Sequence, residues 1–310
     1  MNEFELIRRL TQNLPTNDTV VVGAGDDCAV LDLGAGSRSV LFKTDAVVEG
    51  IHFTRETPPE KIGRKALARC LSDIAAMAGT PTAAVVTIGL PRKFEPAFVE
   101  GIYAGLNLLA REYRVAVVGG ETTTNPERVL VSVALLGTVA CGKAILRSGA
   151  KTGDAIFVTG ELGGSLAGKH LEFEPMLAEA RWLAEHFPIH AMLDVSDGLA
   201  GDLRQILTAS KVGAELLKSA VPISRAAREI AKRGDAAKPA FVAALTDGED
   251  FELLFTVASK TAVPLLDAWK AQFPALKLSC IGKIVAGEGI TLRDSQGVRP
   301  LAAQGYVHFS

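Results

Sequence analysis

The sequence predicts an α/β protein of the α+β type, built as two domains that each contain a mixed sheet and packed helices. Its 310 residues are about twice the length of a typical domain. Apolar strand-like runs alternate with amphipathic helical patterns in both halves of the chain. A basic, glycine-containing stretch from Lys143 to Gly153 separates the halves. We therefore expect one domain over residues 1–142 and a second over residues 143–310.

The first half begins with a strand pattern at 40–43 that runs into Thr44 and Asp45. Two prolines then open a helix that extends to about Ala78, since proline is favoured in the first turn of a helix. Its apolar residues recur at spacings of three and four, which indicates one buried face. Further strands are expected at 83–90, 115–118 and 129–139, with a second helix at 95–111.

The second half repeats this alternation with shorter elements. Strands are expected at 155–159, 192–195, 215–217, 251–256, 278–285 and 289–292. Helices are expected at 161–170, 175–185, 199–209, 225–232, 239–245 and 262–272.

Composition argues against several classes of protein. The net charge is −2 and no Lys/Arg cluster is present, so no nucleic-acid partner is expected. No apolar run reaches the ~18 residues of a membrane helix, and the acidic start is unlike a signal peptide. The cysteines are far apart, which predicts free core thiols and a reducing cytoplasm rather than disulfides. They are Cys28, Cys70, Cys141 and Cys280.

Acidic motifs gather where expected strands begin or end. They are Asp26–Asp27, Thr44–Asp45, Gly119–Thr123, Asp194–Gly198 and Asp247–Asp250. Ligand sites of α/β proteins collect at strand ends, and grouped carboxylates repel one another unless a cation lies between them. Oxygen ligands of this kind suit Mg²⁺ bound to substrate phosphates. Taken singly, each motif is more often a turn or a helix cap than a metal site, and only the five together favour a metal site.

Asp73 lies inside the first expected helix, near the edge of its apolar face. A charge in that position is costly unless it is paired or bound to a metal. Two interpretations stay open, a metal ligand and an ion pair with Arg69 four residues earlier.

The chain carries none of the common nucleotide-binding loops: neither the P-loop, nor the protein-kinase motifs, nor the dinucleotide glycine motif. Arg147 is a candidate phosphate ligand, because guanidinium binds phosphate oxygens in pairs, although a solvated linker residue is the alternative. No Ser–His–Asp or Cys–His arrangement is present, so no covalent nucleophile or general base is expected. His52, as a lone histidine, is open to a structural role.

Taken in order, several segments resemble the thiamine-monophosphate kinase family, and the resemblance spans nearly the whole chain. They are Gly25–Leu31, Thr44–Phe53, Lys65–Met77, Arg147–Ala150, Asp194–Leu199, Gly248–Leu253 and Gly305–Phe309. The resemblance implies the fold of the ATP-binding superfamily that includes aminoimidazole ribonucleotide synthetase, with helices packed on one face of each sheet. It also implies a homodimer, ATP and thiamine monophosphate as substrates, several Mg²⁺ ions and thiamine diphosphate as product.

The same resemblance implies a role for individual residues. The implied metal ligands are Asp27, Thr44, Asp45, Asp73, Glu121, Asp194 and Asp197. The implied ATP contacts are Gly120, Arg147 and Ser196. The implied substrate contacts are His52, Glu249 and Tyr306.

The chain departs from the family pattern in three places. Glu121 stands where the family has aspartate, Asp247 stands where it has glycine, and the segment from Gly164 to Asp194 is short. Two alternatives therefore stay open, a relative that acts on another phosphate acceptor and a nucleotide-binding module without activity.

Overall fold

The computed structural model describes residues 3–34, 36–233, 238–302 and 305–306, which form two compact units. The N-terminal unit consists of Asp18–Ala144 and His170–Ala178. The C-terminal unit consists of the described residues of Met1–Asn17, Ile145–Lys169 and Glu179–Ser310. Each unit is described by itself below.

The N-terminal unit contains a mixed sheet. Its strands are β1 (Val20–Val22), β2 (Ala29–Leu31), β3 (Arg38–Val48), β4 (Thr80–Leu90), β5 (Ala116–Thr124) and β6 (Leu130–Ala140). In the part of the chain that the structure describes, these six strands lie in the order β1-β2-β3-β6-β4-β5. β4 and β5 are parallel, whereas the other neighbours are antiparallel.

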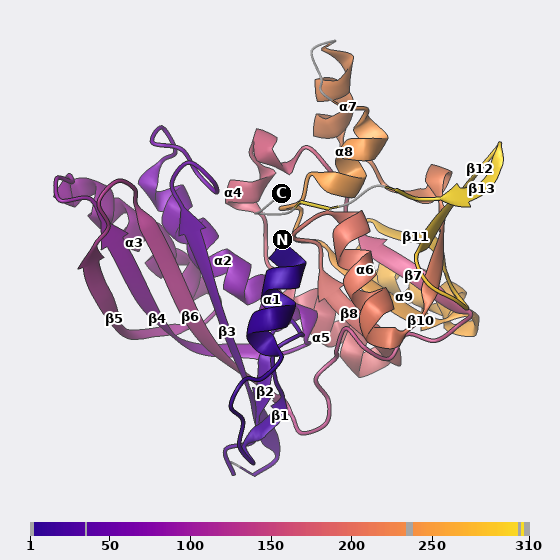
Figure 1. Ribbon diagram of the computed structural model, residues 1–310, viewed down its shortest axis with the longest axis horizontal. Helices are drawn as coiled ribbons and strands as arrows, with labels where there is room; N and C mark the ends of the chain where they lie inside the picture. The colour runs from indigo at the N-terminus through magenta and orange to yellow at the C-terminus, as the bar shows by residue number, and fades with distance from the viewer. Residues whose placement is uncertain (1–2, 35, 234–237, 303–304, 307–310) are drawn as a thin grey trace. The chain divides into compact units, whose positions relative to one another are not determined.

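Two helices cover one face of this sheet, α2 (Pro59–Ala76) and α3 (Pro96–Glu112) (Figure 1). Their backbones approach closely because glycines lie at the crossing. A Cβ atom at Gly63 would lie 1.8 Å from the carbonyl oxygen of Ile102, and one at Gly105 would lie 1.8 Å from that of Glu60. Almost the whole length of α2 is buried, which places its few charged residues in the interior.

The opposite face of this sheet exposes apolar side chains. Phe42 of β3 and Leu136 of β6 are paired in register and are 45% and 39% exposed. Val85 of β4 pairs with Ala134, two residues from Leu136, so it lies on the same face and is 42% exposed. Exposed apolar residues grouped on one sheet face are typical of an interaction surface.

The C-terminal unit contains the second mixed sheet. Its strands are β7 (Asp154–Thr159), β8 (Ile189–Asp194), β9 (Gly213–Leu217), β10 (Leu253–Ala258), β11 (Leu278–Val285), β12 (Ile290–Asp294) and β13 (Gly297–Pro300). Within the described residues, these seven strands follow the order β13-β12-β9-β11-β7-β10-β8. Only β9 and β12 pair in parallel among these neighbours.

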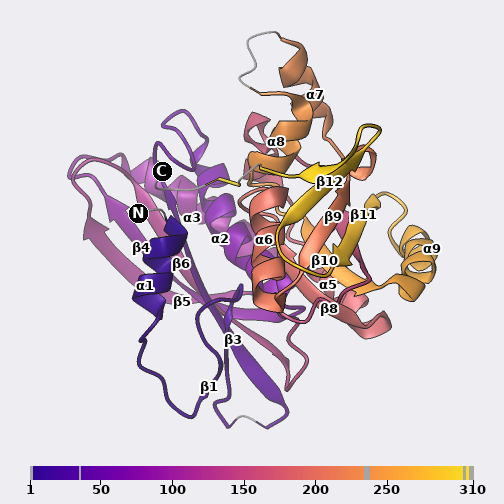
Figure 2. The same cartoon turned by 45° about the vertical axis from the view of Figure 1, so that its right-hand side comes forward.

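The helices around this sheet are short. They are α1 (Glu3–Thr11), α5 (Leu177–His186), α6 (Leu199–Ser210), α7 (Arg225–Lys232), α8 (Ala240–Thr246) and α9 (Ala262–Gln272), with 3₁₀ turns η1 (Ser165–Ala167), η2 (Lys218–Ala220) and η3 (Ser259–Thr261). The one-turn helix α4 (Lys169–Glu172) falls mostly in the N-terminal unit. α6 lies along the sheet (Figure 2), and its apolar residues share one core with the strands. Every residue of β7 is buried, so both faces of the central strands are covered.

The elements differ from the sequence prediction at three informative places. Thr44 and Asp45 lie inside β3, not at its end, because all eleven residues of β3 pair with β6. β5 continues through Gly119, Gly120 and Glu121 to Thr124, because it pairs with β4 along this stretch. The expected helix at 161–170 is interrupted, since Gly163 and Gly164 adopt positive φ angles.

Two further expectations can be compared with the described residues. All four cysteines are free, as predicted, but Cys141 is exposed and Cys280 is half-buried, so only Cys28 and Cys70 are core thiols. Among the described helices, none combines the length and apolar character needed to cross a membrane.

Candidate active site

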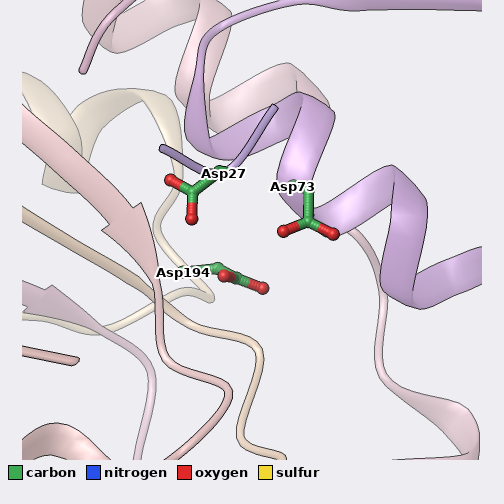
Figure 3. A group of neighbouring side chains, drawn as sticks. All are labelled: Asp27, Asp73 and Asp194. Carbon is green, nitrogen blue, oxygen red and sulfur yellow. The ribbon is translucent and has the colours of Figure 1, made fainter. Parts of the chain in front are cut away.

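Two buried carboxylates of the N-terminal unit lie close together. Asp73 projects from α2, and Asp27 lies in the short segment before β2 (Figure 3). Their side chains offer oxygens within 4.8 Å of each other, and the residues are 5% and 1% exposed. The backbone N–H of Cys28 donates to the sulfur of Met77 (3.1 Å), which fixes the segment carrying Asp27 beside the end of α2.

Lys43 of β3, which the sequence analysis did not single out, forms an ion pair with Asp73. Its Nζ lies 2.9 Å from Asp73 Oδ1 and 4.0 Å from Asp45 Oδ1. Burial lowers the pKa of Lys43, but Asp73 and Asp45 outweigh burial and raise it well above its usual value. Arg69 Nε lies 3.7 Å from Asp45 Oδ2. Asp73 of α2 and Asp45 of β3 are therefore linked through Lys43, and Asp45 also pairs with Arg69.

Thr44 points away from this network. Successive side chains of a strand project to opposite faces, so Thr44 lies opposite Lys43 and Asp45. Its Oγ1 lies 3.5 Å from Ser132 Oγ, on the face that also exposes Phe42. The structure thus brings Asp45 to the α2 side of the sheet without the Thr44 hydroxyl.

Gly120 and Glu121 lie on β5, the edge strand of the sheet. A Cβ atom at Gly120 would lie 1.8 Å from the carbonyl oxygen of Val86, so the pairing with β4 alone requires glycine there. Glu121 is exposed and pairs with Thr87. Within the described residues it is not part of a group of three carboxylates close enough to hold one ion.

His52 lies in the tight turn that follows β3. Its Nδ1 accepts the N–H of Val48 (3.1 Å), which leaves the proton of a neutral ring on Nε2. Its carbonyl oxygen accepts a hydrogen bond from Nζ of Lys65 (2.7 Å), a lysine of α2 that is 0% exposed and also lies 2.8 Å from His170 Nδ1. The turn is therefore held from both its backbone and its ring.

A pocket of about 700 Å³ opens beside this turn in the N-terminal unit. Its wall combines aromatic rings with cationic side chains, including Phe53, Phe94, Arg55 and Arg92. Arg55 also donates to the carboxylate of Glu49 (2.5 Å), which accepts the N–H of Val129 as well. Rings beside guanidinium groups suit an organic phosphate, because apolar contact and phosphate binding are both provided.

In the C-terminal unit, the predicted residues gather around one turn after β8. Asp194 ends that strand opposite Leu253 and is 4% exposed, also shown in Figure 3. The next residue, Val195, donates its N–H to the carbonyl oxygen of Glu252 (2.8 Å). Gly198, with a φ of +97°, then turns the chain into α6. This strand-to-helix turn follows the sequence prediction for the Asp194–Gly198 motif.

Asp202 in the first turn of α6 is a buried carboxylate that the sequence analysis missed. Its Oδ2 accepts the N–H of Asp197 (3.0 Å), and this hydrogen bond joins the turn to the first turn of α6. Burial first, and then the charges of Asp197 and Asp194, raise the pKa of Asp202 well above its usual value. Arg147 opposes this shift, so its positive charge acts on the same group of aspartates.

The same turn contacts the two predicted substrate residues of this unit. The carbonyl oxygen of Ser196 accepts the N–H of Glu249, and that of Asp197 accepts the N–H of Tyr306, both at 2.7 Å. Glu249 is half-buried and Tyr306 is 45% exposed. The structure therefore brings together Asp194, Ser196, Asp197, Glu249 and Tyr306, although they are distant in sequence. His308 and Phe309 lie outside the described residues.

The donor set fits magnesium. Carboxylate oxygens are hard ligands, and Asp73 of α2 and Asp27 of the segment before β2 present theirs within 4.8 Å of each other. Lys43 and Arg69 offset only part of the negative charge of Asp27, Asp45 and Asp73, so a bound cation would be favoured there.

Comparison with known proteins identifies the class of protein to which this chain is similar. Residues 25–139 match the family model "AIR synthase related protein, N-terminal domain" and residues 159–295 match the corresponding C-terminal domain. Among curated proteins, thiamine-monophosphate kinase of Rhodopirellula baltica is 38% identical, with 97% of this chain and 95% of that protein covered. That of Bacillus subtilis is 34% identical over the full length of both.

A solved structure agrees with these matches. The structure described as "AaThiL complexed with AMPPCP and TMP" superposes with a TM-score of 0.81 at 28% identity, covering 99% of this chain and 97% of that one. The chain belongs to the thiamine-monophosphate kinase family. The sequence-based expectation of family and fold is thereby confirmed.

Proposed function

We propose that the protein transfers the γ-phosphoryl group of ATP to thiamine monophosphate, giving ADP and thiamine diphosphate. The observation that supports this most strongly is a set of buried and half-buried aspartates. Asp27 and Asp73 lie within 4.8 Å of each other in the N-terminal unit. Asp194 and Asp197 lie on one turn that also contacts Glu249 and Tyr306 in the C-terminal unit.

We assign the metal-binding role to aspartates of both units. Asp27, Asp45, Asp73, Asp194 and Asp197 are the proposed ligands of several Mg²⁺ ions. Thr44, which faces the other side of β3 from Asp45, and Glu121, which lies on β5, would be ligands of a separate ion. Bound magnesium supplies charge neutralisation of the ATP phosphates. Gly120, Arg147 and Ser196 are the proposed ATP contacts, and His52, Glu249 and Tyr306 the proposed substrate contacts.

The proposed reaction is a direct in-line displacement. An oxygen of the thiamine monophosphate phosphate forms a bond to the γ-phosphorus, while the bond from that phosphorus to the β,γ-bridging oxygen breaks and ADP leaves. The attacking oxygen is already anionic at neutral pH, so it needs no strong base. The protein's part is therefore to orient two phosphates and to offset their repulsion, for which Arg147 is the proposed cationic side chain.

We propose further that the protein is a cytoplasmic homodimer. The open face of the N-terminal sheet supports the dimer, because Phe42, Leu136 and Val85 together expose apolar surface there. The four free cysteines support a reducing compartment.

The test is an activity assay on the purified chain. ATP, Mg²⁺ and thiamine monophosphate are mixed with the protein, and ADP and thiamine diphosphate are quantified by chromatography. Equal amounts of both products are expected, with no ADP when thiamine replaces its monophosphate. ADP formation with a different phosphate acceptor alone would favour a relative of altered specificity. Nucleotide binding without turnover would favour a binding module.

A further inference from the structure

A buried turn in the C-terminal unit forms a hydrogen bond to Glu249, one of the residues to which we assign substrate contact. The turn is Gly163–Gly164–Ser165, between β7 and α4, and it lies against the loop Asp247–Asp250. None of its residues belongs to the sites proposed above. We call it the support turn.

Three donor groups of the support turn make hydrogen bonds to that loop. The N–H of Gly163 donates to both carboxylate oxygens of Asp250, at 3.0 Å each. The N–H of Gly164 donates to Asp247 Oδ2 (2.9 Å). The hydroxyl of Ser165 donates to the carbonyl oxygen of Glu249 (2.5 Å). Ser165 and Asp250 are each 1% exposed, so water does not compete for these bonds.

Glu249 needs this support because its backbone is strained. Its φ is +54°, and that of Phe251 is +51°, both in the left-handed region that side chains other than glycine rarely adopt. Such conformations persist only where the surroundings determine them, and they concentrate at functional sites. Here Glu249 is held on both sides, since its N–H donates to Ser196 and its carbonyl oxygen accepts from Ser165.

The support turn is itself rigid. Gly163 and Gly164 have φ angles of +84° and +70°, and Cβ atoms there would lie 2.6 Å from Ala244 N and 2.7 Å from Ala227 N. The turn is therefore pressed against α8 and α7, and only glycine fits. Because the turn is rigid, the hydrogen bond from the Ser165 hydroxyl can fix the position of the Glu249 carbonyl group.

We infer that Ser165 is a positioning residue that aims the Glu249 side chain at the substrate, with Asp250 aligning the support turn. The inference rests on the proposed function, in which Glu249 contacts thiamine monophosphate. Ser165 itself touches no reacting atom. Its loss should weaken substrate binding while the ATP contacts and the phosphoryl-transfer step stay as they are.

The experiment is a double-mutant cycle on the full chain. Ser165→Ala should raise the KM for thiamine monophosphate by about tenfold, with kcat and the KM for ATP within about twofold of wild type. In a Glu249→Ala background the same substitution should change that KM by less than about twofold, because the side chain to be aimed is gone. Ser219→Ala, an exposed serine of the same unit, is the matched control.

The outcomes separate the two proposals. Equal effects of Ser165→Ala in both backgrounds, or a fall in kcat with KM unchanged, would overturn the positioning role while the kinase activity stands. An unchanged KM in Ser165→Ala would overturn it as well. A wild-type protein without activity on thiamine monophosphate would overturn the proposed function and this inference together.

Discussion

The two units hold their acidic residues in different ways. In the N-terminal unit, Asp73 and Asp45 project from a long helix and a long strand, and Lys43 compensates their charge. In the C-terminal unit, Asp194 and Asp197 lie on a turn that two hydrogen bonds shape: Asp197 N–H donates to the Asp202 carboxylate, and the Ser196 carbonyl oxygen accepts the N–H of Glu249. Regular elements position the first group, and a fitted turn positions the second.

Their sheets differ in the same sense. The central strands of the C-terminal sheet are covered on both faces, whereas the N-terminal sheet has helices on one face and exposed apolar residues on the other. Both units contain a mixed sheet, so the fold class does not distinguish them. They differ in which surfaces are exposed and in how their acidic residues are held. The N-terminal unit has an exposed apolar sheet face and a network of ion pairs around Asp73 and Asp45. The C-terminal unit has loops whose conformation hydrogen bonds determine.

The largest expected effect concerns the charge network. Asp73→Asn keeps the size of the side chain but removes a carboxylate from the proposed magnesium ligands, so kcat should fall at least about a thousandfold, or ~4 kcal/mol. Asp45→Asn should behave alike. Initial rates at saturating magnesium measure this, with circular dichroism to confirm folding.

Asp267→Asn, an exposed helical aspartate of α9, is the control and should retain wild-type activity. If Asp73→Asn stayed within about tenfold of wild type, Asp73 would be a structural partner of Lys43 and not a metal ligand.

The next effect tests the open sheet face. Phe42→Asp combined with Leu136→Asp places two charges in the proposed dimer surface, where association would take them out of water, so the dimer should dissociate. Light scattering should then give a mass near 32.6 kDa, against about twice that for wild type. By contrast, Phe255→Asp in the C-terminal sheet should unfold the protein, because Phe255 is 0% exposed.

A wild-type mass of 32.6 kDa at micromolar concentration would contradict the dimer directly. A double variant that kept the wild-type mass would instead place the dimer interface on another surface.

A smaller effect tests the fitted loops of the C-terminal unit through pH. Burial raises the pKa of Asp250 from 3.8 to about 7, with Glu252 and Asp247 adding to the rise and Lys169 opposing it. Between pH about 4 and about 7, the unfolded chain therefore loses a proton that the native state keeps, and stability falls as pH rises. Asparagine cannot ionise, so Asp250→Asn should gain stability relative to wild type across that window.

The gain should not exceed about 4 kcal/mol, the free energy that corresponds to a shift of this size. Urea unfolding of both proteins at pH 5 and pH 8 measures it. Parallel pH dependences for the two proteins would show that the buried Asp250 carboxyl does not keep its proton.

The sequence predicted the regular elements better than the contacts between them. Spacing of apolar residues located α2, α3 and β6 to within a few residues, because these long elements each bury one periodic face. It placed Thr44 and Glu121 at strand ends, since pairing with β6 and β4 is a non-local property that lengthens both strands.

The site was predicted from motifs, and its supporting residues were missed. Asp194 and Asp197 stand in a recognisable acidic turn, whereas Asp202 carries no local signal and Lys43 only a weak one. Their roles depend on Asp73 and Asp197, which only folding brings near them. A charged residue among apolar neighbours, as in Lys43, was the one available sign.

The smallest expected effect concerns Glu121, where the family pattern has aspartate. Glu121 is exposed on the edge strand β5, so its side chain is not enclosed by neighbours that fix its length. If the chain is a working kinase, the backbone around it suits the longer side chain, and Glu121→Asp should change the rate of thiamine diphosphate formation by less than about threefold, which is under 1 kcal/mol. If the chain is an inactive relative, glutamate is a defect, and aspartate should restore a metal contact worth several kcal/mol.

Initial rates of both versions at several magnesium concentrations distinguish the two. A rise of about tenfold or more, equal to about 1.4 kcal/mol, would show that the charge network of the N-terminal unit is impaired as it stands. We expect no such rise, because Asp27, Asp45 and Asp73 are all retained there, and loss of function removes ligands outright more readily than it lengthens one by a methylene.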